Sequence, residues 1–207
     1  MKNGIQLNIP SERKRESILA AAKKTFIAHG YAGASMDSIA EAAPVSKPTL
    51  YKHFSSKHDL FVAVIVRQCD GVLATPNDET LAVRDPVNGL KSIAFSFVDL
   101  LYTEESLALY RLLIAEQQNF PELGHRVYAS TAVPIIDRIA AYLRQLHEQE
   151  LIHLPDARIS SELLMGMLQG VQHFRCLMGL QATLSRLERE QLVESALQLF
   201  WKGHQCK

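Results

Sequence analysis

Cationic and hydroxyl side chains gather between Ser35 and Lys57, in the segment SMDSIAEAAPVSKPTLYKHFSSK. Its second half carries Ser46, Lys47, Thr49, Tyr51, Lys52 and His53 within about two helical turns. Such side chains donate to phosphate oxygens, and residues at the start of a recognition helix reach base edges in the major groove. A helix with a purely structural role does not usually expose so many donors at its start. We therefore interpret residues 35–57 as a helix-turn-helix that binds DNA.

Serines mark the helix starts that this interpretation requires. Ser35 and Ser46 each precede an apolar helical pattern, as N-cap residues do, and Ser56 begins a Ser-x-x-acid capping box. Ser35 and Ser46 could also meet a phosphate, because a helix N-terminus offers free backbone N–H groups. Lys47, Pro48 and Thr49 open the expected recognition helix, in the position from which side chains reach base edges.

The packing of the two helices follows from their apolar residues. Ile39, Leu50 and Phe54 form a stripe that is expected to be buried. Pro44 separates the helices, because the residue before a proline is pushed out of helical geometry.

The charge of the chain is unevenly distributed. Residues 1–57 contain nine Lys and Arg against four Asp and Glu, whereas the remaining residues contain 13 against 18, so the net charge is zero. A basic N-terminal segment followed by an acidic remainder indicates a nucleic-acid partner. The neutral net charge is weaker evidence against such a partner. Two interpretations of Arg13, Lys14 and Arg15 stay open: each contacts a DNA phosphate, or each is ordinary solvated surface.

The segment from Gly30 to Phe61 resembles the DNA-binding domain of TetR/AcrR-type transcriptional regulators. The family pattern has a GY turn, a polar cap, an IA-x-x-A helix and VSKxTLYxHFxSKxxLF, which appear here as Gly30-Tyr31, Ser35, Ile39-Ala40 with Ala43, and Val45 through Phe61. The resemblance implies that Tyr51, Lys52 and His53 contact bases or the DNA backbone and that Lys57 contacts a phosphate. Pro44 stands where the family usually has glycine, so the geometry of the turn is open.

The remaining chain is helical in pattern, which makes the fold all-α with about nine helices. We expect an N-terminal arm and a three-helix helix-turn-helix domain over residues 1–57, a linking helix over 57–74, and a helical effector-binding and dimerisation domain over 75–207. Thr75-Pro76-Asn77-Asp78 marks the boundary. Further helices are expected at 87–101, 104–117, 121–149, 156–179 and 185–202, with a kink at Pro134. Residues 111–123 resemble AcrR-like effector domains.

A ligand pocket needs apolar walls with a few polar groups, and the second domain offers both. The candidate ligand-binding residues are Phe97, Tyr102, Tyr110, Gln117, Phe120, His125, Tyr128, His173, Phe174 and Cys176. The alternative for each aromatic residue is ordinary helical core. His173 and Cys176 are three residues apart, but with no third ligand at a telling spacing they do not make a metal site. No metal and no cofactor is expected.

The last two long helices carry apolar faces that look too large for the core of one monomer. Their residues are Leu163, Met167, Gly170, Val171, Phe174, Leu192, Ala196, Leu197, Phe200 and Trp201. Gly166 and Gly170 would permit close helix approach. We expect these helices to pair in a homodimer, because two DNA-binding heads read a palindrome better than one.

Together these patterns predict a dimeric repressor that a lipophilic or aromatic small-molecule effector releases from a palindromic operator in double-stranded DNA. The chain shows no signal peptide and no stretch that could span a membrane, and its three widely spaced cysteines fit reduced thiols, so we expect a cytoplasmic protein with no membrane partner. Alternatives are a thiol-redox-responsive regulator acting through Cys176 or Cys69 and a DNA-binding protein without an effector. An enzyme is not expected, because HExxH, GxSxG and Gly-rich phosphate loops are absent.

Overall fold

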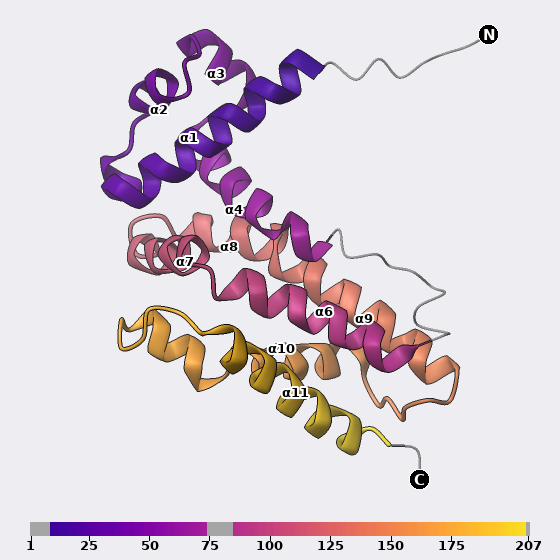
Figure 1. The fold of residues 1–207 in the computed structure, drawn as a ribbon. Coiled ribbons are helices and arrows are strands. Elements are labelled where there is room, and N and C mark those ends of the chain that lie inside the picture. The colour runs from indigo at the N-terminus through magenta and orange to yellow at the C-terminus, as the bar shows by residue number, and fades with distance from the viewer. Residues whose placement is uncertain (1–8, 74–84, 206–207) are drawn as a thin grey trace, which may run out of the picture.

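The computed structural model of the chain describes residues 9–73 and 85–205. The secondary structure of these residues consists of helices joined by turns and loops, with no strand among them. The helices are α1 (Ile9–Gly33), α2 (Met36–Ala42), α3 (Lys47–His53), α4 (Lys57–Leu73), α6 (Pro86–Leu101), α7 (Glu104–Glu116), α8 (Pro121–Ser130), α9 (Ala132–Glu148), α10 (Ala157–Leu177) and α11 (Arg186–Gly203). Figure 1 shows α1–α3, here called the head, at one end, and α6–α11, the body, at the other, with α4 between them. The predicted fold class is confirmed.

The head forms around the apolar stripe that the sequence indicates. Ile39, Leu50 and Phe54 are buried in one cluster with residues of α1 and α4. Ser35 and Ser46 are N-caps, since their side chains accept hydrogen bonds from the amides of Ser38 and Thr49. These caps satisfy amides that a helix of seven residues cannot satisfy internally. The Ser56 hydroxyl likewise accepts from the amide of Asp59 at 3.1 Å.

The turn between α2 and α3 keeps the geometry that glycine normally supplies, although Pro44 occupies it. The Val45 amide donates to the Ala40 carbonyl at 3.1 Å, which is the longer bond of a Schellman motif. That motif requires a positive φ at the residue after the C-cap, and Pro44 has φ 22°. A proline ring prefers about −65°, and without an N–H it cannot make the second bond of the motif. The helix pair therefore survives with local backbone strain at Pro44.

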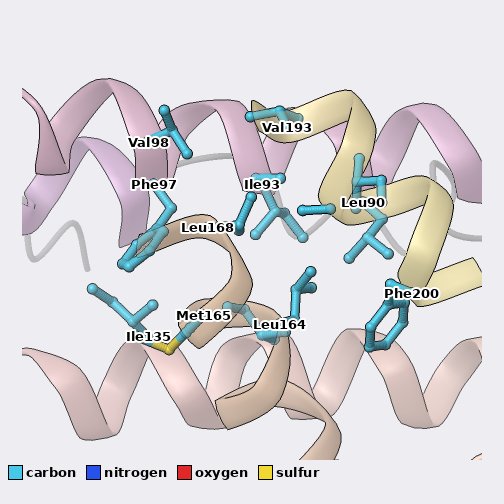
Figure 2. Packing of buried hydrophobic residues seen from close by; sticks show 14 of the residues in the cluster. Leu90, Ile93, Phe97, Val98, Ile135, Leu164, Met165, Leu168, Val193 and Phe200 are labelled. Atoms are coloured by element: carbon cyan, nitrogen blue, oxygen red, sulfur yellow. The ribbon is translucent and has the colours of Figure 1, made fainter. Parts of the chain in front are cut away.

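A second hydrophobic cluster forms the core of the body. Figure 2 shows its side chains converging from four helices: Leu90, Ile93, Phe97 and Val98 from α6, Ile135 from α9, Leu164, Met165 and Leu168 from α10, and Val193 and Phe200 from α11. These residues lie at helical spacing along each element, so each helix buries one face.

Helix α4 belongs to both cores. Leu60, Phe61 and Val64 pack in the cluster of the head, whereas Val72 packs in the cluster of the body. The cluster of the head also receives body residues, namely Leu109 of α7 and Leu123 and Val127 of α8. The packing therefore joins the head and the body across the boundary expected at residue 57.

Two element boundaries differ from the expectation. Helix α1 begins at Ile9, inside the N-terminal arm that we expect over residues 1–10, and its regular geometry is interrupted at Gly30, where φ is 74°. The single helix expected over 121–149 is two helices, α8 and α9, which meet at Thr131 with φ −128° and ψ −63°. Pro134 lies in the first turn of α9, where its missing N–H costs nothing, so it starts a helix instead of kinking one. Residues 1–8 of the expected arm and the turn at Thr75–Asp78 lie outside the described residues.

Helix α10 is broken at Gly170, where φ is 57°. The buried hydroxyl of Tyr102 enters this break and donates to the carbonyl of Gln169. Burial raises the pKa of this hydroxyl, and a hydrogen bond with the His173 backbone lowers that pKa to a smaller extent. Gln169 and His173 would share an i→i+4 bond in an uninterrupted helix, so Tyr102 bridges the gap in the α10 ladder.

Part of the apolar surface expected to pair two copies belongs to the core of one chain. Ala196, Leu197 and Phe200 of α11 are buried in the cluster of the body, which corrects that expectation. Ile159 and Leu163 are exposed before the break of α10 at Gly170, and Val171, Phe174 and Met178 are exposed after it. Separately, no helix within residues 9–73 and 85–205 is long and apolar enough to cross a membrane.

Candidate functional site

The start of α3 presents the side chains that the sequence assigns to DNA. Lys47, Pro48, Tyr51 and Lys52 are exposed, and Thr49 and His53 are half-buried. Pro48 lies in the first turn of α3, after the Ser46 cap. Exposed donors on the first turns of a short helix are placed to reach a groove of DNA. The predicted residues therefore share one accessible edge of the head.

Lys47 is held by an acidic neighbour from α2. Its Nζ lies 2.7 Å from Asp37 Oδ1, and this hydrogen-bonded carboxylate raises the pKa of Lys47. Asp37 lies in the first turn of α2, where a negative charge suits the helix dipole. The pair is exposed and therefore weak, so a phosphate can compete for the lysine.

The basic start of α1 lies beside the end of α3, although 39 residues separate Arg15 from Phe54. The Arg15 guanidinium is 5.4 Å from the centre of the Phe54 ring. The Ser17 hydroxyl donates to the Ala43 carbonyl at 3.2 Å, which fixes α1 against the turn between α2 and α3. The structure thus adds Arg15 of α1 to the edge formed by α3.

Lys57 is placed differently from the other candidate contacts. Its Nζ donates to the carbonyls of Tyr31 at 2.8 Å and Ala34 at 3.0 Å, and it lies 4.5 Å from the centre of the Tyr31 ring. Burial lowers the pKa of this amine. Lys57 therefore fastens the end of α1 to the start of α4, and a phosphate contact would require it to exchange these bonds.

The body contains a cavity of about 340 Å³ that α4 closes on the side of the head. Helix α4 contributes Ile65, Gln68 and Cys69 to the lining. The remaining walls come from α6–α10 and include Phe97, Leu100, Leu101, Ser106, Leu109, Tyr110, Leu113, Val127, Tyr128, Thr131, Ile135, Ile136, Glu162, Met165 and Gln169. Its volume and mostly apolar walls are those of a small-molecule site.

Three of the ten candidate ligand-binding residues line this cavity: Phe97, Tyr110 and Tyr128. Phe120 instead packs against Tyr31 in the head, with ring centres 5.1 Å apart. The hydroxyl of Tyr102 is used within α10. These two aromatic residues pack within the protein, which agrees with the alternative that an aromatic candidate belongs to ordinary helical core.

The other five candidates lie outside the lining. Gln117, His125 and Phe174 are exposed, and Cys176 is buried in the core of the body. His173 is buried between the rings of Tyr102 and Tyr110, at 5.7 Å and 5.2 Å between ring centres, and burial lowers its pKa. No group of three or more His, Cys, Asp or Glu side chains within the described residues could hold a metal ion.

Sequence reasoning missed the polar groups of the lining. Gln68 Nε2 is 3.5 Å from Ser106 Oγ, which brings α4 and α7 together inside the cavity. Gln68 continues the apolar stripe of α4 at helical spacing. A polar residue in an apolar stripe was the sequence feature that could have identified it as part of the lining. Nothing in the local sequence marks Ser106 or Gln169.

The two described cysteines are poorly suited to redox sensing. Cys69 and Cys176 are both buried and free. Burial raises the pKa of Cys69 to about 11 and also raises that of Cys176. Because the thiolate is the reactive form, neither environment activates its thiol. Cys206 lies outside the described residues.

Two family profiles match the chain. Residues 18–64 match the profile described as "Bacterial regulatory proteins, tetR family". Residues 88–204, more than half of the chain, match the one described as "AefR-like transcriptional repressor, C-terminal domain".

Relatives agree with these matches. The chain is 36% identical over 124 residues to the HTH-type transcriptional activator FasR of Mycolicibacterium smegmatis, an alignment that covers 59% of this chain and 56% of FasR. The chain thus spans just over half of FasR.

Solved structures extend the similarity to nearly the full length. A TetR-family transcriptional regulator from Mesorhizobium loti has a TM-score of 0.81 at 29% identity, covering 95% of this chain and 98% of that one. The flavonoid-responsive regulator FrrA has a TM-score of 0.75 at 28% identity, covering 95% and 99%.

Proposed function

Because this chain belongs to the TetR family of transcriptional regulators, we propose that it acts as a homodimeric repressor. It binds a palindromic operator in double-stranded DNA and is released by a small lipophilic or aromatic effector. The observation that carries this proposal is the position of α4, which closes the effector cavity with Ile65, Gln68 and Cys69 and fills the core of the head with Leu60, Phe61 and Val64.

DNA contact is assigned to the edge formed by α3. Lys47, Pro48 and Thr49 reach base edges from the first turn of α3, and Tyr51, Lys52 and His53 contact bases or the backbone. Ser35 and Ser46 present their helix N-termini to phosphates. Lys57 acts from the start of α4, where it also holds the turn that follows α1.

The effector acts through α4. A ligand in the cavity touches one face of α4 one turn beyond residues that pack inside the head. Since protein interiors are close-packed, a shift of α4 moves the head with it. Two heads so displaced no longer match the spacing of a palindrome, and the population moves away from the DNA-bound state.

Dimerisation is assigned to the exposed apolar stripe of α10. Leu163, Val171 and Phe174 have 60%, 63% and 61% of their surfaces exposed, and Ile159 and Met178 extend the row. Although the break at Gly170 interrupts this row, both segments of α10 expose large apolar side chains, as surfaces that pack on a partner do. A two-fold pairing of α10 with its copy buries this row in both chains at once.

Repression and an aromatic effector have support from the relatives. The profile matching residues 88–204 describes a repressor, whereas FasR is named an activator, so the sign of regulation needs its own test. FrrA is described as flavonoid-responsive, and its similarity favours an aromatic ligand in the cavity of this chain. A reporter fused to the promoter next to its own coding region should rise when the gene is deleted; a fall would mean activation.

DNA binding is tested by titrating that promoter fragment at several salt concentrations. The affinity should fall with salt with a slope of about −0.9 per phosphate neutralised. Lys52→Ala should weaken binding to every fragment and reduce the slope by about 1 per head. Lys202→Ala, an exposed lysine on α11, is the matched control and should change neither quantity. Binding that does not depend on salt would contradict the proposal.

A further inference from the structure

The charge content of the cavity limits the chemistry of its ligand. No lysine, arginine or histidine lines it within the part of the chain that the structure describes, and the one charged residue of the lining is Glu162. A carboxylate or phosphate moved from water into apolar surroundings loses its hydration, and only a cation or several donors restore that energy. The cavity offers no such cation.

The cation that pairs with Glu162 of the lining is already engaged by two carboxylates. Arg158 lies next to Glu162, with its Nε 3.3 Å from Glu162 Oε1. Arg158 also pairs with Asp137, since Nη1 of the arginine lies 3.0 Å from Oδ1 of the aspartate. A guanidinium held between two carboxylates has little attraction left for a third anion. An anionic group at the exposed mouth near Glu162 therefore finds no favourable partner in Arg158.

Neutral hydrogen-bonding groups are available deeper in the cavity. The Gln68 amide offers donors and an acceptor, and its 3.5 Å separation from Ser106 Oγ makes that contact weak and easily exchanged. The hydroxyl of Ser106 and the amide of Gln68 come from different helices, so a ligand group between them would bridge α7 and α4.

The cavity size sets the scale of the ligand. Its volume of about 340 Å³ is roughly twice that of an apolar cavity of about 150 Å³ that holds benzene. A skeleton of two fused rings with one small polar group fits that space. Longer chains would have to leave through the mouth beside Tyr110, Tyr128 and Glu162, which are exposed.

We propose that the cavity takes an uncharged, largely apolar molecule of about two rings, whose hydroxyl or carbonyl group meets Gln68 and Ser106, and that it rejects carboxylates and phosphates. This inference rests on the proposed function, because it defines the chemical class of that effector. The contact with Gln68 also places the polar end of the ligand on α4, the helix that reaches the head.

The test compares ligands that share one skeleton. Naphthalene, 2-naphthol and 2-naphthoate are titrated by calorimetry into the full-length protein. We expect 2-naphthol to bind at least about tenfold more tightly than naphthalene, and 2-naphthoate at least about 100-fold more weakly than 2-naphthol. Equal or tighter binding of 2-naphthoate would overturn the inference and leave the proposed function standing. Binding of none of the three would remove the cavity as the effector site, and both proposals with it.

Variants locate the polar contact. Gln68→Leu should reduce the affinity for 2-naphthol about tenfold and leave that for naphthalene unchanged, which separates a lost hydrogen bond from a misfolded cavity. Gln68→Lys should improve binding of 2-naphthoate over 2-naphthol. Gln191→Leu, at an exposed glutamine of α11 outside the lining, is the matched control that should leave 2-naphthol binding unchanged. If Gln68→Leu weakens both ligands equally, or neither, Gln68 does not receive the polar group.

Discussion

The head and the body arrange their interiors in opposite ways. In the head, the rings of Phe26 and Phe61 lie with centres 5.0 Å apart, and Tyr31 lies 5.1 Å from Phe61, so aromatic side chains fill the core. The body encloses a cavity of about 340 Å³ instead. The candidate DNA contacts of the head consequently lie on the outside, at the edge formed by α3, whereas the candidate effector site of the body lies inside.

The proposed mechanism gives a different mechanical role to each region. A filled core moves as one unit when a helix that enters it moves, because it has no space to absorb the displacement. A cavity lined by six helices can change shape when a ligand fills it. Helix α4 takes part in both, so in the proposed mechanism it is the element that would convert a change in cavity shape into a movement of the head.

The largest effect is expected from deleting a ring in the filled core. Phe61→Ala should lower the free energy of unfolding by about 3–5 kcal/mol, because Phe61 is fully buried among aromatic rings. Ile136→Ala should cost about 2 kcal/mol, at the lower end of the usual range, because Ile136 already borders the cavity. Urea denaturation measures both. Equal losses would mean that the two interiors are packed alike.

The break in α10 tests the interior of the body on a finer scale. Tyr102→Phe removes the hydroxyl that bridges Gln169 and His173, and should cost about 1–3 kcal/mol if those backbone groups stay unpaired. Tyr110→Phe, at a half-exposed tyrosine of the cavity lining, should be nearly neutral and serves as the control. A neutral Tyr102→Phe would show that the α10 ladder closes by itself.

In the head, Pro44→Gly should stabilise the protein. Glycine adopts positive φ without strain and supplies the amide that the Schellman motif lacks, so a gain of about 1 kcal/mol is expected. For a chain of this size that gain raises Tm by about 2–4 °C in a thermal melt. Pro48→Gly, in the first turn of α3 where proline is favourable, should lower Tm and is the opposite control. A lower Tm for Pro44→Gly would contradict the conclusion that the backbone is strained at Pro44.

The smallest effect concerns the contact between the two regions. Hydrogen bonds from Ser55, from Arg126 of α8 and from Ser56 lower the pKa of Asp59 from 3.8 to about 2. Its contribution to stability is therefore complete above pH 3.8 and is lost as the pH falls through about 2. The Asp59 side chain is 30% exposed, which limits that contribution to about 1 kcal/mol.

Asp59→Asn isolates this contribution. The variant should be less stable than the parent at pH 7 and should lose less stability between pH 4 and pH 2. Urea denaturation at a series of pH values measures both changes. An unchanged acid dependence would mean that the carboxylate contributes nothing to the contact between α4 and α8.

How far the sequence predicts the structure depends on the region. In the head, the roles of Ser35, Ser46, Ile39, Leu50 and Phe54 follow from local rules, because caps and stripes are set by neighbours within a few residues. The contact between Arg15 and the Phe54 ring does not follow from local rules, because it depends on how α1 crosses α2 and α3.

The cavity could not be derived in this way. Its lining comes from six helices, and whether an aromatic residue faces it depends on helix rotation, which separates Tyr128 in the lining from Phe120 in the head core. The division of residues 121–149 was missed because Pro134 is compatible both with a kink and with a helix start. The bonds that Lys57 makes to the end of α1 were not predicted, because the carbonyls that accept them are 23 and 26 residues away.

The sharing of side chains between head and body has a consequence for the construction of hybrid regulators. A hybrid joined at residue 57 would set a foreign α4, α7 and α8 against this head, replacing Phe61, Leu109 and Leu123 in its core. A junction after α4 would keep the α4 residues but would still exchange those of α7 and α8. A hybrid that keeps the switch therefore needs the junction after α4 together with the matching side chains grafted onto α7 and α8.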